Sequence, residues 1–116
     1  MSAAHHKLNN LVAIVDRNFV QIDGSTSEVM EIEPLKSKWE SFGWSTFECN
    51  GNNIKELIEC FEKAESFEDG PSVIIAKTKM GKGVKTIEDD YRWHGKAPAE
   101  DQVDNFIKQV ENDGVY

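Results

Sequence analysis

The strongest constraint on the fold is a set of three short segments typical of strands, separated by segments with helical periodicity. The runs are LVAIVD at 11–16, WSTFEC at 44–49 and SVIIAKT at 72–78. The first and third lack polar alternation, which is typical of strands buried on both faces, as in a parallel sheet. Strands that alternate with helices along a chain predict an α/β fold with a parallel sheet.

The segment between the first and second runs predicts a helix. Pro34 suits the first turn of a helix, where its missing N–H has no cost. Leu35, Trp39 and Phe42 follow at the spacing of one helical face, and Gly43 is typical of a helix end.

Two further helices are predicted. Asn53 is a good N-cap, and Glu56 three residues later completes a capping-box pattern. The apolar face of the helix that follows contains Ile54, Leu57, Ile58, Phe61 and Ala64. The last helix, 99–112, has an apolar face made of Val103, Phe106, Ile107 and Val110.

These elements predict a three-layer αβα arrangement, with residues 1–116 forming one partial domain. Residues 3–10 (AAHHKLNN) resemble the end of a helix, and three strands are few for a parallel sheet covered on both faces. We therefore expect the chain to be part of a larger domain. We also expect an unpaired sheet edge beside the first strand, which is an aggregation hazard.

Composition narrows the class of protein. The 116 residues carry 13 basic and 21 acidic side chains, a net charge of -8, which disfavours nucleic acid and anionic membranes as partners. The apolar runs are far shorter than a membrane helix needs, and no export signal is visible. We therefore expect a cytoplasmic protein in which Cys49 and Cys60 are reduced thiols.

Ligands of open α/β sheets bind beyond the carboxyl ends of the strands. Three segments are expected there: 16–24, 50–53 and 77–94. The last contains two glycines, Gly81 and Gly83, among four lysines, which are Lys77, Lys79, Lys82 and Lys85. This pattern predicts a phosphate or diphosphate site, and the alternative is a solvated, flexible charged loop. The acidic residues 88–90 are expected to form a solvated turn.

Two other side chains are candidates for chemistry at this edge. Asp16 and Asn18 offer the oxygen donors that Mg²⁺ prefers, and the alternative for Asn18 is a turn with a left-handed backbone. After a short extended piece at 20–22, Asp23 and Gly24 predict a turn. Further along, His94 could carry protons near neutral pH, or it could be an ordinary surface residue.

Four motifs, in this order and spacing, are similar to the thiamine-diphosphate-binding domain of transketolases. They are AAHHKLNNLVAIVDRNFVQIDG, EPLKSKWESFGW, VIIAKTKMGKGV and WHGKAP. The resemblance covers nearly the whole chain and is strongest to the N-terminal subunit of the two-gene transketolases, of which this chain resembles the C-terminal part.

The resemblance implies a cofactor site with thiamine diphosphate and a divalent cation, Mg²⁺ or Ca²⁺. It places five residues against the cofactor: Asn18, Ile22, Met80, Gly81 and His94. By the same resemblance, the side chain of Asn18 and the backbone carbonyl of Val20 bind the metal, and His94 is catalytic because it reaches both the diphosphate and the substrate.

The family activity is transfer of a two-carbon ketol unit from a ketose phosphate to an aldose phosphate. Several parts of the family pattern are absent here: the Gly-Asp-Gly segment with the first metal ligand, the upstream histidines for the sugar phosphates, and the activating glutamate of the partner pyrimidine-binding subunit. We therefore expect a fragment that is inactive alone, from a parent enzyme that is a dimer or heterotetramer.

Two alternatives stay open at this point. One is another thiamine diphosphate enzyme, such as a deoxyxylulose-phosphate synthase or a 2-oxoacid dehydrogenase, although the IDG and WHGKAP segments speak against it. The other is a non-catalytic α/β interaction domain that binds a partner chain without a cofactor.

Overall fold

The computed structural model describes residues 1–114, which divide into two compact units. The first, called the sheet unit, contains residues 1–17 and 32–77. The second, called the loop unit, contains residues 18–31 and the chain from 78 onward. Each unit is described by itself.

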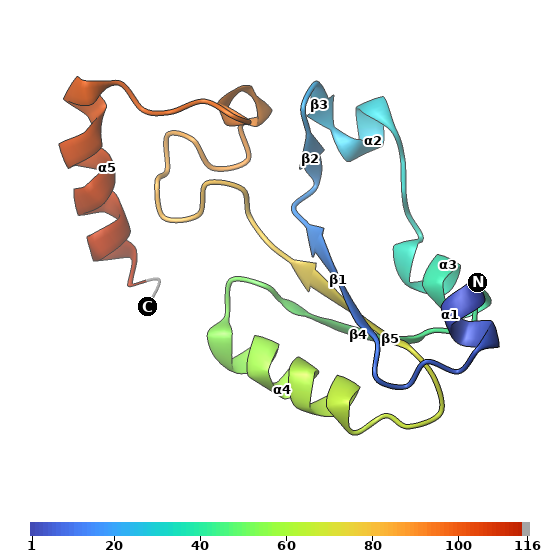
Figure 1. Ribbon diagram of the computed structural model, residues 1–116. Coiled ribbons are helices and arrows are strands. Elements are labelled where there is room, and N and C mark those ends of the chain that lie inside the picture. The colour runs from blue at the N-terminus through green and yellow to red at the C-terminus, as the bar shows by residue number, and fades with distance from the viewer. Residues whose placement is uncertain (115–116) are drawn as a thin grey trace. The chain divides into compact units, whose positions relative to one another are not determined.

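A three-stranded parallel sheet forms the centre of the sheet unit (Figure 1). Its strands are β1 (Val12–Arg17), β5 (Ser72–Lys77) and β4 (Ser45–Asn50), in the order β1-β5-β4. Both pairs are parallel, so the predicted α/β fold with a parallel sheet is confirmed. Chain order differs from sheet order because the last strand inserts between the first two.

Burial differs sharply between the central strand and the first strand. Val73, Ile74 and Ile75 of β5 are at most 2% exposed, as predicted for a strand covered on both faces. Ile14 of β1 is 56% exposed, so the expectation that 11–16 is buried on both faces is wrong for this chain. The burial of β1 alternates along the strand, so one of its faces is uncovered. Within the described residues β1 pairs with β5 alone, and the predicted unpaired edge is confirmed.

Helices lie on both sides of this sheet. The helix α4 (Ile54–Glu65) packs against β4 and β5, whereas α3 (Leu35–Ser41) packs against β4 from the other side (Figure 1). The short helix α1 (Ser2–His5) lies close to the end of α3. The arrangement is the three-layer fold that the sequence predicts.

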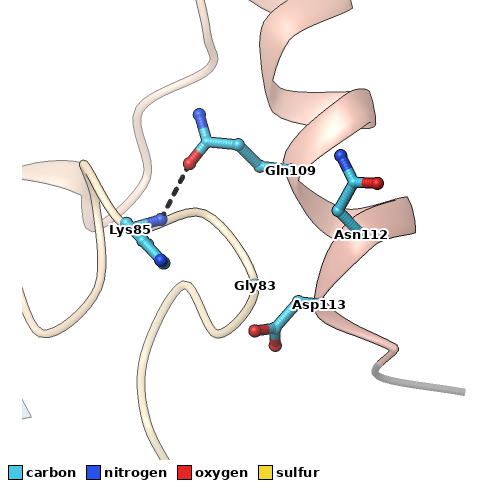
Figure 2. A pocket seen from close by; sticks show the side chains of 5 residues that line it. All are labelled: Gly83, Lys85, Gln109, Asn112 and Asp113. Carbon is cyan, nitrogen blue, oxygen red and sulfur yellow. Dashed lines mark hydrogen bonds between the residues drawn. The ribbon is translucent and has the colours of Figure 1, made fainter.

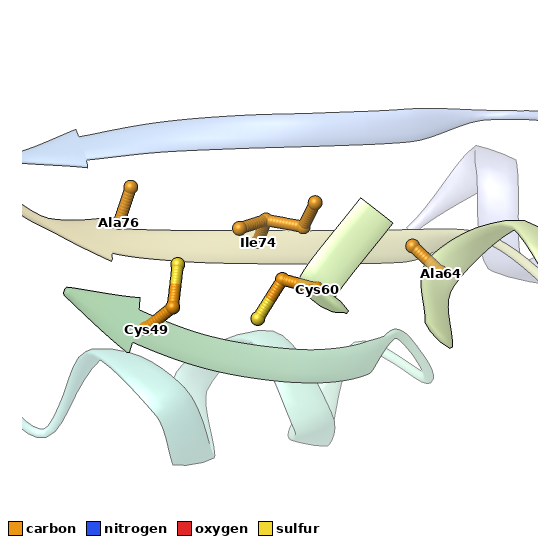
Figure 3. Packing of buried hydrophobic residues seen from close by; sticks show 5 residues of the cluster. All are labelled: Cys49, Cys60, Ala64, Ile74 and Ala76. Carbon is orange, nitrogen blue, oxygen red and sulfur yellow. The ribbon is translucent and has the colours of Figure 1, made fainter. Parts of the chain in front are cut away.

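The core between α4 and the sheet is small and contains both cysteines (Figure 3). Cys60 and Ala64 of α4 face Cys49, Ile74 and Ala76 of the two strands. Both cysteines are free thiols, as predicted. Burial, with a smaller contribution from the neighbouring Cys60 thiol, raises the pKa of Cys49 to about 11.

The apolar face predicted for α4 is only partly buried. Leu57 packs against the core with Cys60 and Ala64, but Ile54 and Ile58 are 61% and 53% exposed. The buried face of α4 is therefore centred on Leu57, Cys60 and Ala64, whereas Ile54 and Ile58 face outward.

The N-terminus of α4 is capped as predicted, with one difference. Asn53 Oδ1 accepts hydrogen bonds from the N–H groups of Lys55 and Glu56, at 3.1 and 3.3 Å. The Glu56 carboxylate does not return to the Asn53 N–H. It accepts from the Asn53 side-chain amide and from the N–H of Asn50, each at 2.9 Å, and so ties the cap to the end of β4.

The loop unit contains a small antiparallel hairpin, β2 (Val20–Gln21) and β3 (Gly24–Ser25). The helix α2 (Thr26–Val29) and the 3-10 helix η1 (Tyr91–Trp93) were not predicted. The last helix, α5 (Glu100–Asp113), matches its prediction within one residue at each end. Within residues 1–114, no helix has both the length and the apolar character of a membrane span.

Candidate functional site

The carboxyl ends of the three parallel strands meet at one level of the sheet. Arg17 of β1 lies opposite Lys77 of β5, which lies opposite Asn50 of β4. The N–H of Gly51 donates to the Lys77 carbonyl at 2.7 Å, so the loop after β4 starts at the same edge. The three segments that sequence analysis assigned to the site, 16–24, 50–53 and 77–94, therefore all begin at this edge.

Charges at this edge are paired within the sheet unit. Lys77 Nζ lies 2.9 Å from a carboxylate oxygen of Glu48. The buried Arg17 donates from Nε to Glu33 at 2.8 Å. The N–H of Leu35 and the Arg17 guanidinium hold the pKa of the Glu33 carboxyl below its usual range.

The backbone around Asn18 has an unusual geometry. Asn18 Oδ1 accepts from the Val20 N–H at 3.2 Å, which folds the side chain back over the next two residues. The left-handed residue is Phe19, with φ 64°, and not Asn18 as the alternative turn assumed. Thr26 holds this conformation, because its N–H and its hydroxyl both donate to the Phe19 carbonyl, at 2.9 and 3.3 Å.

A bulky residue with positive φ is strained, and such strain is concentrated at functional sites. Phe19 separates the two residues, Asn18 and Val20, that the resemblance assigns to a metal. The fold therefore fixes the backbone at the position where two oxygen donors are expected.

An open pocket of about 450 Å³ in the loop unit joins two of the predicted segments. Its lining residues are Phe19, Val20, Ser25, Thr78, Lys79 and Asp89. Segments 16–24 and 77–94 therefore share one cavity. Of the predicted site residues, only Val20 lines it.

Met80 and Gly81 follow the pocket-lining Lys79 in sequence and are both half-buried. The Met80 carbonyl accepts from the N–H of Asp89 at 3.0 Å, so the loop closes on itself here. Gly81 has φ 67°, and a Cβ at this position would lie 2.8 Å from Cγ1 of Ile87. The position requires glycine for the loop's own packing, and contact with a cofactor stays a prediction.

Two lysines of this loop, Lys79 and Lys82, form ion pairs with acidic residues of the loop unit. Lys79 Nζ lies 3.1 Å from Glu88, which lowers the pKa of the Glu88 carboxyl and raises that of Lys79. Lys82 contacts Asp113 of α5. The predicted acidic turn at 88–90 is present, and Asp89 is solvated, at 52% exposed. Glu88 and Asp90 are only 19% exposed and have partners in the loop unit.

Polar contacts connect helix α5 to the loop that contains Lys82 and Lys85 (Figure 2). The Lys85 N–H donates to Gln109 Oε1 at 3.0 Å, across a pocket of about 360 Å³. Gly83, Asn112 and Asp113 complete its lining. The loop is thus hydrogen-bonded to α5, and the phosphate or diphosphate site expected there stays a prediction.

His94 and Ile22 both lie at exposed positions. His94 directly follows η1, and its N–H donates to the Tyr91 carbonyl at 2.9 Å. The 3-10 helix η1 packs against β3, so the segment that leads to His94 lies beside the hairpin that begins with Val20. Ile22, at the hairpin turn, is 64% exposed.

The donor chemistry of the segment fits a hard cation. Asn18 and Val20 supply an amide oxygen and a carbonyl oxygen, which suit Mg²⁺ or Ca²⁺. Among residues 1–114, however, no group of three or more His, Cys, Asp or Glu side chains is placed to hold a metal. A cation bound here needs further ligands, and a diphosphate is one source of oxygens.

Comparison with known proteins identifies the family. The family described as "Transketolase, thiamine diphosphate binding domain" matches residues 1–113. The chain belongs to this family. The resemblance that the four motifs carry is therefore confirmed.

Relatives of this transketolase-family chain include proteins named as transketolase subunits. It is 37% identical over 110 residues to a subunit of the apulose-4-phosphate transketolase of Phocaeicola vulgatus, covering 95% of this chain and 39% of that protein. It is 33% identical over 114 residues to a 6-deoxy-6-sulfo-D-fructose transketolase subunit from Clostridium sp., covering 98% and 42%. The chain thus spans about two fifths of the length of these relatives.

Solved transketolase structures share the fold. The Campylobacter jejuni transketolase superposes with a TM-score of 0.73 at 23% identity, over 97% of this chain and 21% of that one. The transketolase of Leishmania mexicana gives a TM-score of 0.67 at 21% identity, over 96% and 20%. At this level of identity the likeness establishes the three-layer fold.

Sequence analysis missed several residues that organise the site. Phe19, Thr26 and Asp89 fix the backbone or line the pocket, and no pattern distinguishes them from ordinary loop residues. The position of Arg17 could have indicated a buried ion pair, because a charged side chain at the end of an apolar strand needs a partner. That partner, Glu33, could not be identified without the fold.

Proposed function

We propose that this chain supplies part of the thiamine diphosphate site of a transketolase, which transfers a two-carbon ketol unit from a ketose phosphate to an aldose phosphate. The observation that carries the proposal is the pocket shared by the Phe19–Val20 and Thr78–Lys79 segments. Membership of the thiamine-diphosphate-binding family over residues 1–113 supports it.

In this proposal Asn18 and Val20 bind a divalent cation, Mg²⁺ or Ca²⁺, through the side-chain amide oxygen and the backbone carbonyl. Ile22, Met80 and Gly81 supply walls against the cofactor. Bound thiamine diphosphate supplies the electron sink that the chemistry needs. The cation neutralises the diphosphate, which an acidic chain would otherwise repel.

His94 is proposed as the residue that acts on the substrate. Its imidazole orients the sugar phosphate and exchanges a proton with the oxygens at the reacting carbons, which an imidazole can do near neutral pH. Exposure of His94 at the end of η1 leaves the ring accessible to a ligand.

We further propose that a partner subunit with the pyrimidine-binding domain completes the site in a cytoplasmic dimer or heterotetramer. Relatives whose names describe one of the subunits of a transketolase support this assignment. In this proposal the described residues supply two oxygen donors for the cation, and the glutamate that activates the cofactor belongs to the partner subunit. The 116-residue chain is therefore expected to be inactive alone.

Calorimetric titration with thiamine diphosphate and Mg²⁺ tests the proposal. Binding to the unchanged chain is expected to need Mg²⁺ and to weaken roughly tenfold or more in Asn18→Ala, because the cation loses one oxygen ligand. Asn105→Ala, at an exposed position on α5, is the matched control and should bind as the unchanged chain does. Absence of binding heat in all three would favour the non-catalytic interaction domain.

A further inference from the structure

The chain leaves the sheet unit after Arg17 and returns to it at Ile32. The intervening segment, 18–31, contains both proposed metal donors, Asn18 and Val20. The two ends of this segment are adjacent to one ion pair, between Arg17 and Glu33. We call this ion pair the neck pair.

We infer that the neck pair is a positioning device, which holds segment 18–31 in the conformation that presents Asn18 and Val20 to the cation. The inference rests on the proposed function for the identity of the ligand. The claim that the neck pair controls the conformation of segment 18–31 does not depend on the proposed function.

The geometry of the neck pair differs from that of an ordinary surface ion pair. The Arg17 side chain is 5% exposed and donates from Nε to Glu33 Oε1 at 2.8 Å. Glu33 Oε2 accepts from the N–H of Leu35 at 2.8 Å. One carboxylate therefore joins the end of β1 to the first residue of α3, and both of its oxygens are used.

Closing a loop with such a contact restricts the conformations of everything between its ends. Residues 17 and 33 are 16 positions apart, and the segment between them has a hairpin and a four-residue helix but no large core of its own. A segment with little buried apolar surface opens locally more easily than the sheet. Its order therefore depends strongly on how its ends are held.

Other ion pairs in the sheet unit do not have this arrangement. Lys36 and Glu40 are one helical turn apart on α3, 3.9 Å from each other, and about half exposed. Glu40 Oε1 also accepts from the Thr46 hydroxyl at 2.9 Å, which the amide oxygen of Gln can still do. Removing the Glu40 charge therefore releases neither end of 18–31. Glu40→Gln is therefore a matched control for Glu33→Gln, with the same chemical change and a similar exposure, 49% against 47%.

Hydrogen exchange of the full chain tests the inference. Glu33→Gln keeps the side-chain size but replaces one carboxylate oxygen by an NH₂ group, so it cannot serve Arg17 and Leu35 as before. Amides in 18–31 are expected to exchange roughly tenfold faster, because a charged hydrogen bond at a buried group is lost. Amides of β5 should keep their protection, and Glu40→Gln should match the unchanged chain.

Two results would overturn the positioning role. Equal exchange of 18–31 in Glu33→Gln and the unchanged chain would show that the neck pair does not control the segment. An equal loss of protection in β5 would show a general stabilising role. Glu33→Asp, which keeps the charge, should recover part of the protection.

A second arm adds thiamine diphosphate and Mg²⁺ and follows protection of 18–31 as Mg²⁺ is raised. The Mg²⁺ midpoint is expected to rise roughly tenfold in Glu33→Gln, since the ordering of the segment must then be supplied by binding. Equal midpoints would overturn the link between the neck pair and the ligand. Absence of any protection in the unchanged chain would contradict the proposed function instead, while the exchange comparison without cofactor still decides the role of the neck pair.

Discussion

Single residues in the loop unit show how backbone geometry and side-chain chemistry are tied together. Phe19 adopts a left-handed backbone that is held by Thr26, and Gly81 adopts one that leaves no room for a side chain beside Ile87. Both positions flank the pocket or the loop that lines it. The residues that form the candidate site are therefore fixed more by backbone constraints than by burial.

Gly81→Ala is expected to destabilise the chain more than Gly95→Ala. Both glycines have positive φ, 67° and 70°, so both substitutions bear the same conformational strain. Only at Gly81 would the new Cβ meet Ile87, at 2.8 Å, whereas nothing lies within 4 Å at Gly95. Urea unfolding should show a difference of about 1 to 3 kcal/mol. Equal losses would mean that Ile87 moves aside freely.

The buried thiol of Cys49 gives a pH-dependent prediction. Its pKa rises from 9.0 to about 11 on folding, chiefly because burial disfavours the thiolate. The folded state therefore binds this proton more tightly, and its stabilising contribution is complete below pH 9 and is lost as the pH rises toward 11. One pKa unit corresponds to about 1.4 kcal/mol, so the loss is roughly 2 to 3 kcal/mol.

Urea unfolding at several pH values between about 8 and about 11 measures this loss. Cys49→Ala should show a shallower decline over the same interval, because other groups titrate there in both proteins. Parallel declines would show that the Cys49 thiol does not contribute. Below about pH 9 the same burial should make Cys49 slow to react with thiol reagents until the chain unfolds.

At the scale of secondary structure, strand β1 combines an open edge with exposed apolar side chains. Ile14 is 56% exposed on a strand that pairs on one side within the described residues. Open strand edges and exposed apolar side chains both favour association between chains. We expect the chain to self-associate as its concentration rises, as the unpaired edge predicts.

Ile14→Lys should reduce this self-association, because a charge on an edge strand opposes pairing with another edge. Light scattering after size-exclusion chromatography, over a concentration series, gives the apparent mass. Ile107→Lys is the matched control, since Ile107 is 51% exposed but lies on α5. A monomeric unchanged chain at all concentrations would contradict the prediction.

Elements with strong periodicity could be predicted from sequence, and weakly patterned ones could not. The runs at 44–49 and 72–78 and the cap at Asn53 contain their own signals, so their type and place are confirmed. Helix α2 and η1 are too short to show a period. The exposure of β1 depends on which neighbours cover it, and a strand's own composition does not contain that information.

At the scale of the whole molecule, the candidate site depends on segments far apart in sequence. Topology predicted that the loops after β1 and β5 approach each other, because parallel strands end at one edge. The lining of the shared pocket by Ser25 and Asp89 could not be predicted, since it depends on how each loop folds back. The roles of Asn18, Ile22, Met80, Gly81 and His94 toward a cofactor stay predictions.

The purified chain is expected to show no turnover with xylulose 5-phosphate and ribose 5-phosphate, even with thiamine diphosphate and Mg²⁺ present. On the proposed function, the reason is that the cation needs ligands beyond Asn18 and Val20, and the cofactor needs the activating glutamate of a partner subunit. A coupled assay of ketol transfer measures this. Activity above that of a His94→Ala control would contradict it.

The loop unit is assembled from two stretches of chain that are interrupted by most of the sheet unit. No single continuous peptide therefore contains it, and residues 78–114 transplanted to another scaffold would lack the hairpin that carries Val20. Transfer of the loop unit between relatives by swapping one continuous segment of sequence should accordingly fail. A chimaera would have to take residues 18–31 together with the chain from 78 onward. It would also need Arg17 and Glu33, which flank the first of these segments.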